Sequence, residues 1–255
     1  MTTEIPATAP APAPVNEPKP NPFARIFGVL FSPGETFASI ARRPDWVVPL
    51  FVIVLVGYVG TALILPRMDW DAISAMQEEQ IRAKNPNISQ EQLDQMAKYT
   101  RAGGKVFGWI APALFVLWYL IVAGVLLLVF RLFGGEGTFK QAFSATLYSW
   151  MPLLLNSIVV TVILALRGGK FDPTQMATLV KSNPAFLVSM KEHPVLFALL
   201  SSFDLFTIWT IVLLVIGFAA LSRLSRVKSA VFVVSLWIVC ILIKLIGPAL
   251  QTLRK

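Results

Sequence analysis

The sequence predicts an all-α membrane protein, a bundle of five transmembrane helices with a short interfacial helix at its N-terminal side. Of the 255 residues, 56% are hydrophobic and only 14% are charged, which is about half the charged fraction usual in soluble domains. Five apolar stretches reach the roughly 20 residues that a helix needs to cross the hydrocarbon. They are continuously apolar, whereas the strands of a membrane barrel alternate and last only about ten residues.

The expected spans divide the chain into membrane helices and loops. Their approximate bounds are 47–65, 106–130, 142–166, 195–221 and 230–250. The first three contain no charged residue, while the fourth contains Asp204 and the fifth Lys244. Proline inside an apolar run kinks or delimits a helix, and such prolines are Pro49, Pro112, Pro152 and Pro248.

Residues 1–21 differ from the rest in composition. They are rich in Ala and Pro and lack apolar periodicity, so they cannot bury enough surface to offset the entropy of ordering. We expect a disordered tail, a membrane domain over 22–250 and a short C-terminal tail at 251–255. No continuous apolar core precedes Phe23, so a secretory signal is not expected there.

The segment before the first span is amphipathic. Its large apolar residues recur at helical spacing, at Phe23, Ile26, Phe27, Leu30 and Phe31. This spacing places them on one stripe of a helix. Because the segment is too short to cross, we expect it to lie on the bilayer surface.

A second helix start follows and leads the chain into the membrane. Ser32 is a candidate N-cap, Pro33 suits the first turn and Glu35 can complete a capping box. Phe37 continues the apolar face, and Pro44 and Trp46 guide the chain into the bilayer with an interfacial aromatic side chain. We interpret the segment as a membrane anchor, with a partner-binding helix as the alternative.

The loop at residues 66–105 is predicted to be a helical hairpin. Ser89 and Gln92 form a capping-box pattern, followed by a helix to about Tyr99, and Trp70 belongs to a second helix before Pro86. We expect this hairpin to be a solvated cap on the bundle rather than a recognition module.

The loop at 167–194 contains Asp and Asn residues that precede proline. Asp172-Pro173 and Asn183-Pro184 are natural pairs of N-cap and first-turn residues. Two short helices are therefore expected in this loop.

The distribution of basic residues predicts the membrane topology and the kind of partner that the protein contacts. The net charge is +8, but the basic residues lie in loops beside apolar runs, which favours contact with anionic lipid headgroups over nucleic acid. The short turn at 222–229 carries Arg223, Arg226 and Lys228 and should be cytoplasmic. This places the N-terminus inside and, after five spans, the C-terminus outside.

No catalytic, cofactor-binding or metal-binding set is predicted. The single cysteine, Cys240, excludes an internal disulfide, and the single histidine, His193, excludes a site built from several histidines. Phosphate-loop, zinc-protease and nucleophile-elbow patterns are missing from the sequence.

Asp204 and Lys244 are the candidate functional residues, because charges inside a membrane are expensive and commonly functional. Three interpretations remain open. Ser201-Ser202-Phe203-Asp204 can start a helix and leave Asp204 near the interface as a cap. The two residues can form an intramembrane pair, or they can belong to a proton or ion pathway. The first two interpretations are compatible.

Several segments together resemble bacterial members of the Yip family of integral membrane proteins. The first comprises Leu30, Ser32, Pro33, Glu35, Thr36, Phe37, Ile40, Pro44, Trp46, Pro49 and Leu50. The later ones comprise Phe139, Phe143, Ala145, Tyr148 and Pro152, then Phe203, Asp204, Trp209, Gly217, Ser225 and Lys228. The resemblance covers about residues 22–250. It implies a five-span protein of the bacterial inner membrane, with no established catalytic residues.

Three classes of function follow. We favour a non-enzymatic membrane scaffold or adaptor that acts on the lipid bilayer and on protein partners through the 66–105 loop or the N-terminal interfacial helix. A transporter or channel component using Asp204, Lys244 and Asn156 is the alternative. An intramembrane enzyme ranks third because it needs a polar constellation that the spans do not offer.

Overall fold

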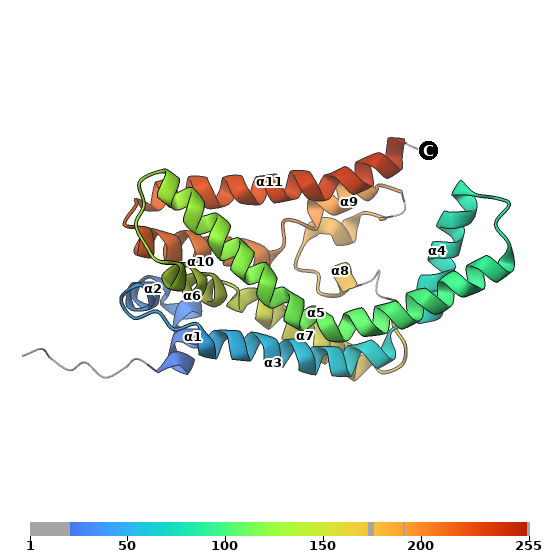
Figure 1. Cartoon of the computed structure of the whole chain (residues 1–255), viewed down its shortest axis with the longest axis horizontal. Coiled ribbons are helices and arrows are strands. Elements are labelled where there is room, and N and C mark those ends of the chain that lie inside the picture. The colour runs from blue at the N-terminus through green and yellow to red at the C-terminus, as the bar shows by residue number, and fades with distance from the viewer. Residues whose placement is uncertain (1–20, 173–175, 191, 254–255) are drawn as a thin grey trace, which may run out of the picture.

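Five long apolar helices run side by side along the molecule (Figure 1). The computed structural model describes residues 21–172, 176–190 and 192–253. All five are long and apolar enough to cross a membrane, as predicted. They are α3 (Val47–Ile64), α5 (Gln90–Leu132), α6 and α7 together (Phe139–Ser149 and Met151–Arg167), α10 (Leu205–Ser222) and α11 (Arg226–Leu253).

Helix α6 lies at the centre of the bundle. Every residue from Ala142 to Ser149 is buried, because α6 packs against α5, α10 and the N-terminal helices. Thr138 and Gln141 close a capping box at its start. The predicted single span at 142–166 is divided at Trp150, since Pro152 has no N–H and stands in the first turn of α7.

Aromatic rings join three helices around this centre. The Phe130 ring of α5 lies 5.0 Å from the Phe218 ring of α10, between centroids, and 5.3 Å from the Phe232 ring of α11. Phe130 and Phe218 are fully buried. These contacts fix α5, α10 and α11 against one another at one end of the bundle.

The predicted fourth span is two helices. Helix α9 covers Pro194–Leu200, and α10 begins at Leu205 after a break. The capping alternative for Asp204 anticipated this start of α10, while the uninterrupted span at 195–221 is wrong. The break lies beside the polar cavity described below.

The N-terminal segment forms two helices, α1 (Pro22–Phe31) and α2 (Pro33–Arg42), at the end of the bundle (Figure 1). The exposure of Phe23, Phe27 and Phe31 on α1, Phe31 to 80%, is compatible with the surface prediction, whereas Ile26 and Leu30 of the same predicted stripe pack against the core. Helix α2 does not fit the surface prediction. Phe37 is only 1% exposed, because α2 packs against α10 inside the bundle.

The expected capping box at the start of α2 is also wrong. Ser32 occupies the N-cap position, but its hydroxyl makes no capping hydrogen bond among the described residues. The Thr36 hydroxyl instead donates to the Ser32 carbonyl at 2.9 Å. Glu35 stays exposed in the first turn, where its charge suits the helix dipole.

A buried arginine ties α1 to α2. The Arg25 guanidinium donates to the Arg43 carbonyl at 2.9 Å and to the Ser39 hydroxyl at 2.9 Å. The Tyr148 hydroxyl of α6 donates to the Asp45 carboxylate at 3.3 Å nearby. Because buried charged groups are costly unless they are hydrogen-bonded, this network holds the N-terminal helices in a defined position.

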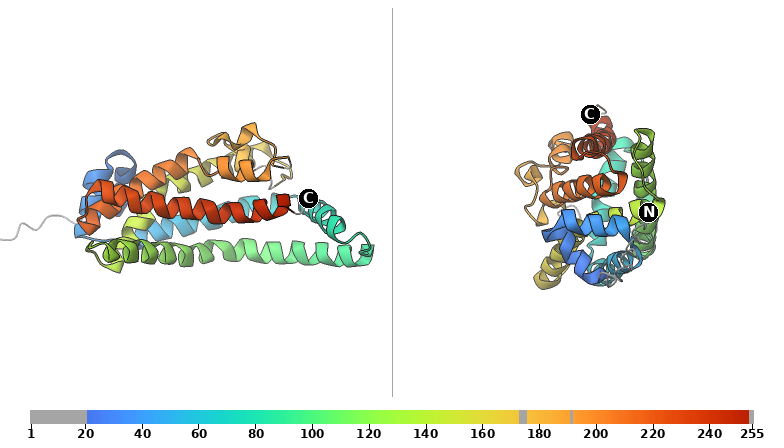
Figure 2. Two further views of the ribbon diagram at one scale, coloured as in Figure 1. Left: turned by 90° about the horizontal axis from the view of Figure 1, so that it is seen from above. Right: turned by 90° about the vertical axis from the view of Figure 1, so that its left-hand side faces the viewer.

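The first loop is a helical hairpin, as predicted, made of α4 (Trp70–Lys84) and the start of α5. The Ser89–Gln92 capping box is confirmed. The helix does not end near Tyr99, however, and runs into the second span as one helix of 43 residues. The hairpin extends beyond the bundle instead of capping it (Figures 1 and 2).

Two glycines of α5 seat the base of this hairpin. A Cβ on Gly104 would overlap the Trp70 ring, and one on Gly108 would lie 2.7 Å from the Leu65 side chain. Only glycine permits such close approach of a neighbouring side chain. Leu65 belongs to a short 3₁₀ turn, η1 (Leu65–Arg67), which follows α3.

The loop at 167–194 folds back on the bundle. Asn183 caps the 3₁₀ turn η3 (Pro184–Leu187) through Ala185 N–H at 3.1 Å, as predicted. Helix α8 covers Met176–Leu179. The start predicted at Asp172-Pro173 includes Pro173, which lies outside the described residues. A bridge between Met68 and Phe171 joins this loop to the first one.

Gly217 is the contact point of α2 on α10 and offers a test of the buried position of α2. A Cβ there would lie 2.9 Å from the Phe37 ring. We expect Gly217→Ala to lower the free energy of unfolding by about 1–3 kcal/mol through overpacking, measured by denaturant unfolding in detergent.

Gly103→Ala is the matched control for this substitution. A Cβ on Gly103 meets no described atom within 4 Å, so this change should be neutral or stabilise α5 slightly. Equal stability of the two variants would contradict the packing of α2 inside the bundle.

Candidate functional site

A polar cavity of about 280 Å³ lies where α7, α10 and α11 meet the 167–194 loop. It combines one carboxylate, one ammonium group, two amides and several hydroxyls within otherwise apolar helices. Its lining is Leu153, Asn156, Val160, Met176, Val180, Ser182, Asn183, Ser201, Asp204, Thr207 and Lys244. Both charged residues predicted within the spans are therefore part of one cavity.

Asp204 is the N-cap of α10. Its carboxylate accepts from the N–H groups of Phe206 at 2.9 Å and Thr207 at 3.2 Å, and from the Ser182 hydroxyl. The side chain is almost inaccessible, with 7% of its surface exposed. The capping interpretation of Asp204 matches this position, and the positive end of the helix dipole offsets part of the buried charge.

Lys244 lies on α11 and faces the break between α9 and α10. Its ammonium donates to the hydroxyls of Ser201 at 2.8 Å and Ser202 at 3.0 Å. Among the described residues, no carboxylate lies within ion-pair distance of it. The direct pair with Asp204 is thus not formed, because the Asp204 oxygens are turned toward the start of α10 and toward Ser182.

The two charges lie at the same depth in the bundle, as the helix lengths suggest. Helix α10 has 18 residues between Asp204 and the basic turn, and Lys244 lies 18 residues beyond Arg226. At 1.5 Å per residue both rises are about 27 Å. If the basic turn lies at one boundary of a hydrocarbon core about 30 Å thick, the cavity lies near the opposite boundary.

One polar atom in the lining is buried without a partner. The Asn156 carbonyl oxygen Oδ1 has no hydrogen-bond partner among the described residues. Buried polar atoms of this kind are rare and call for a specific explanation. The sequence analysis grouped Asn156 with Asp204 and Lys244 in the transporter alternative, and all three residues line this cavity.

The hydroxyl partners were the residues that sequence reasoning missed. Ser182 reaches Asp204 from the preceding loop, where the Ser182 carbonyl also accepts from Leu205 N–H at 2.9 Å. Ser201 and Ser202 were read as part of a helix start and not as partners of Lys244. The local signal for a break was present, since Ser201 and Ser202 stand three and two residues before Asp204, but it did not indicate that their hydroxyls would contact Lys244.

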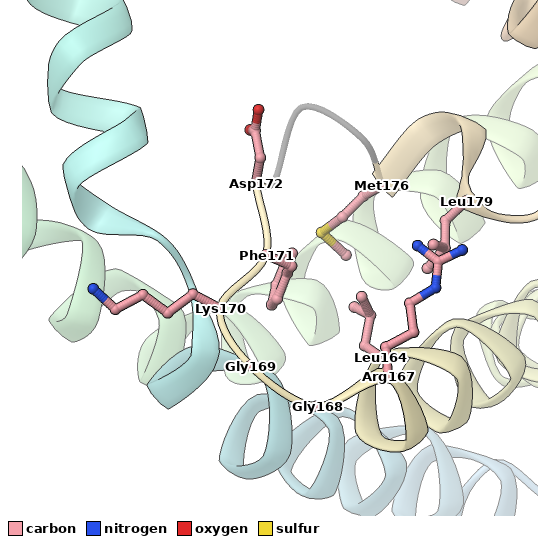
Figure 3. A pocket seen from close by; sticks show the side chains of 9 residues that line it. All are labelled: Leu164, Arg167, Gly168, Gly169, Lys170, Phe171, Asp172, Met176 and Leu179. Carbon is pink, nitrogen blue, oxygen red and sulfur yellow. The ribbon is translucent and has the colours of Figure 1, made fainter.

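A second, smaller cavity of about 190 Å³ lies beside the 168–169 turn (Figure 3). Arg167 points toward Met176 and Leu179, while Lys170 points away. Lys170 Nζ lies 3.3 Å from the Asp71 carboxylate on α4. This cavity brings together fewer complementary polar groups than the first, so the Asp204–Lys244 cavity is the stronger candidate site.

Comparison with known proteins assigns the chain to a family. The sequence model of the Yip1 domain matches residues 27–246, a range that includes four spans, most of the fifth and both charged residues of the cavity. The chain belongs to the Yip1-domain family. The membrane protein YknW of Bacillus subtilis (strain 168) is 28% identical over 211 residues, covering 79% of this chain and 80% of YknW. No solved structure matches the chain.

The Yip1-domain match and the fold together describe a multi-pass membrane protein. In this Yip1-domain protein the segment before the first span, which includes Phe37 and Trp46, packs against the bundle. Phe37 packs in the core, and the Trp46 ring lies 5.9 Å from the Phe143 ring of α6. Within the described residues, no cluster of three or more His, Cys, Asp or Glu side chains suits a metal ion.

Capping by Asp204 predicts different effects for two substitutions. Asp204→Asn keeps side-chain oxygen acceptance at the N-cap, whereas Asp204→Ala removes it. We expect the Ala variant to be less stable than the Asn variant by about 0.5–2 kcal/mol, measured by denaturant unfolding in detergent. Equal stability of the two variants would show that the cap contributes nothing.

Proposed function

We propose that this Yip1-domain protein is a non-enzymatic scaffold or adaptor of the bacterial cytoplasmic membrane. The observation that supports it best is the arm, defined as residues 70–105, which contains α4 and the start of α5. Helix α5 is about 65 Å long at 1.5 Å per residue, roughly twice the hydrocarbon thickness. Part of α5 therefore stands outside the bilayer.

The arm is internally braced and offers a free surface. The Arg101 guanidinium pairs with the Asp71 carboxylate, and the Thr100 hydroxyl donates to the Gln77 side chain at 2.9 Å. In α4, whose residues are all described, none is buried. Tyr99 is 76% exposed. A rigid hairpin with an exposed surface is suited to binding a protein partner. We therefore favour partner recognition over the role of a solvated cap.

The lipid bilayer is the second proposed partner. Phe23, Phe27 and Phe31 of α1 are exposed, and α1 lies at the end of the bundle where α10 is followed by α11 (Figure 1). Aromatic side chains at headgroup level and nearby Arg and Lys residues favour contact with an anionic membrane surface. This supports the prediction that α1 lies on the membrane surface. Helix α2 does not lie there, because it packs against α10.

A transporter or channel component is the alternative, and the polar cavity is what favours it. The cavity lies at one hydrocarbon boundary. Between it and the basic turn, residues 205–222 of α10 and 229–243 of α11 contain no charged side chain. The absence of further charged residues along these helices favours the scaffold over an ion pathway.

We propose that the N-terminus and the basic turn face the cytoplasm, and that the arm and the C-terminus face the periplasmic side. Single cysteines would be placed on a Cys240→Ser background, which removes the chain's only cysteine. Arg42→Cys should react with an impermeant maleimide from the cytoplasmic side only, and Tyr99→Cys from the opposite side only. The reverse pattern would invert the topology.

Partner recognition by the arm is tested with a photo-crosslinking amino acid in place of Tyr99 in living cells. We expect discrete protein adducts that Met96→Glu greatly reduces, because Met96 is exposed three residues earlier on the same helix. The same crosslinker at Ile243, which is exposed on α11, should not give these adducts. Adducts that survive Met96→Glu, or none at all, would contradict an adaptor role for the arm.

The alternative makes its own prediction in liposomes. Purified protein that carried an ion flux abolished by both Asp204→Asn and Lys244→Met would support a transporter and contradict the scaffold. We expect no such flux above that of protein-free liposomes.

A further inference from the structure

We propose that the cavity between Asp204 and Lys244 binds a phospholipid headgroup that carries both a phosphate and a primary ammonium group, as in phosphatidylethanolamine. The ammonium of the lipid would face Asp204 and Asn156, and its phosphate would face Lys244. This site is separate from the arm and from α1, so it does not depend on the scaffold proposal.

The depth of the cavity matches that of a headgroup. Asp204 and Lys244 each lie about 27 Å along their helices from the basic turn. If the basic turn lies at one headgroup layer, the cavity lies at the other. Its volume of about 280 Å³ approaches the lower limit of small-molecule pockets, about 300 Å³, and can take a headgroup but not the acyl chains.

The charges of the cavity call for a zwitterion. Among the described residues, neither Asp204 nor Lys244 has an ionic partner, although both line the same cavity. Charges kept apart near hydrocarbon retain much of their desolvation penalty. A ligand with one positive and one negative group satisfies both residues at once, whereas a ligand with a single charge satisfies one of them.

The remaining hydrogen-bonding capacity fits the same ligand. An ammonium group has three donors, and Lys244 donates two of them to Ser201 and Ser202, which leaves one for a phosphate oxygen. On the other side, Asn156 Oδ1 has no partner in the described part of the chain. It offers an acceptor to a ligand N–H in the cavity that Asp204 also lines.

Lipid can approach the cavity from the side. Lys244 is exposed, and its neighbours Leu242 and Ile243 on α11 are also exposed. In a bilayer this surface of α11 contacts acyl chains. A lipid whose chains lie along α11 can therefore place its headgroup beside Lys244 without leaving its leaflet.

The proposal predicts that phosphatidylethanolamine is distinguished from two other phospholipids. Phosphatidylcholine is also a zwitterion of net charge zero, but its quaternary ammonium has no N–H to donate to Asp204 and Asn156. Phosphatidylglycerol is an anion and has no cationic group. Retention should therefore favour phosphatidylethanolamine over both.

The test uses the full chain purified from vesicles containing equal parts of phosphatidylethanolamine, phosphatidylcholine and phosphatidylglycerol, with retained lipid measured by native mass spectrometry. We expect phosphatidylethanolamine to be retained about tenfold or more over phosphatidylcholine, since a hydrogen bond to a charged group is worth at least about tenfold in affinity. Lys244→Met and Asp204→Asn should each abolish this preference.

Two controls separate binding from folding. Lys228→Met removes an exposed lysine of the basic turn and should keep the preference. Asp204→Asn keeps a capping oxygen, so loss of lipid in a variant with wild-type thermal stability reports on the lost charge. Equal retention of phosphatidylethanolamine and phosphatidylcholine by the wild-type protein would overturn the proposal, as would loss of the preference in Lys228→Met.

A competition experiment identifies the source of the headgroup. Free phosphoethanolamine in the extraction buffer should displace the lipid only at concentrations far above those of the lipid itself, because the acyl chains remain held in the bilayer or micelle. Binding of free phosphoethanolamine without any retained phosphatidylethanolamine would overturn the assignment to a lipid.

Discussion

The architecture depends on one constraint: backbone polar groups in hydrocarbon must be hydrogen-bonded within the protein. The break between α6 and α7 and the break between α9 and α10 both satisfy this constraint. At Trp150 the chain stays hydrogen-bonded, because Trp150 N–H donates to the Thr146 carbonyl at 3.2 Å and Leu154 N–H donates to the Trp150 carbonyl at 3.0 Å. At the start of α10 the Asp204 carboxylate accepts from the N–H groups of Phe206 and Thr207, which have no partner within the helix.

Much of this fold could be predicted from the sequence because membrane helices depend on local properties. Length and apolarity identified five spans, and the Ser89–Gln92 pattern identified the start of α5. The position of α2 could not be predicted, since an apolar stripe has the same pattern whether it faces lipid or protein. The contact that decides between them, Phe37 on Gly217, joins residues far apart in the chain.

The candidate site could be predicted only in part, because some of its features are local in the sequence and others are not. Asp204 and Lys244 were identified because charges are rare inside spans, and the turn between α10 and α11 places them at similar depth. Their actual partners depend on two features without a local signal. One is the loop that brings Ser182 to Asp204, and the other is the break that directs Ser201 and Ser202 toward Lys244.

The continuity of α5 has a mechanical consequence. Its first turn lies at the tip of the arm, and Phe130 near its other end is packed between Phe218 and Phe232. Pro112 lies inside this helix, has no N–H to donate to the preceding turn and is where the helix bends most easily. The contacts of Trp70 on Gly104 and Leu65 on Gly108 hold α5 on the arm side of Pro112, and the Phe130 contacts hold it on the other side, so the two parts of α5 are anchored separately on either side of a bendable residue.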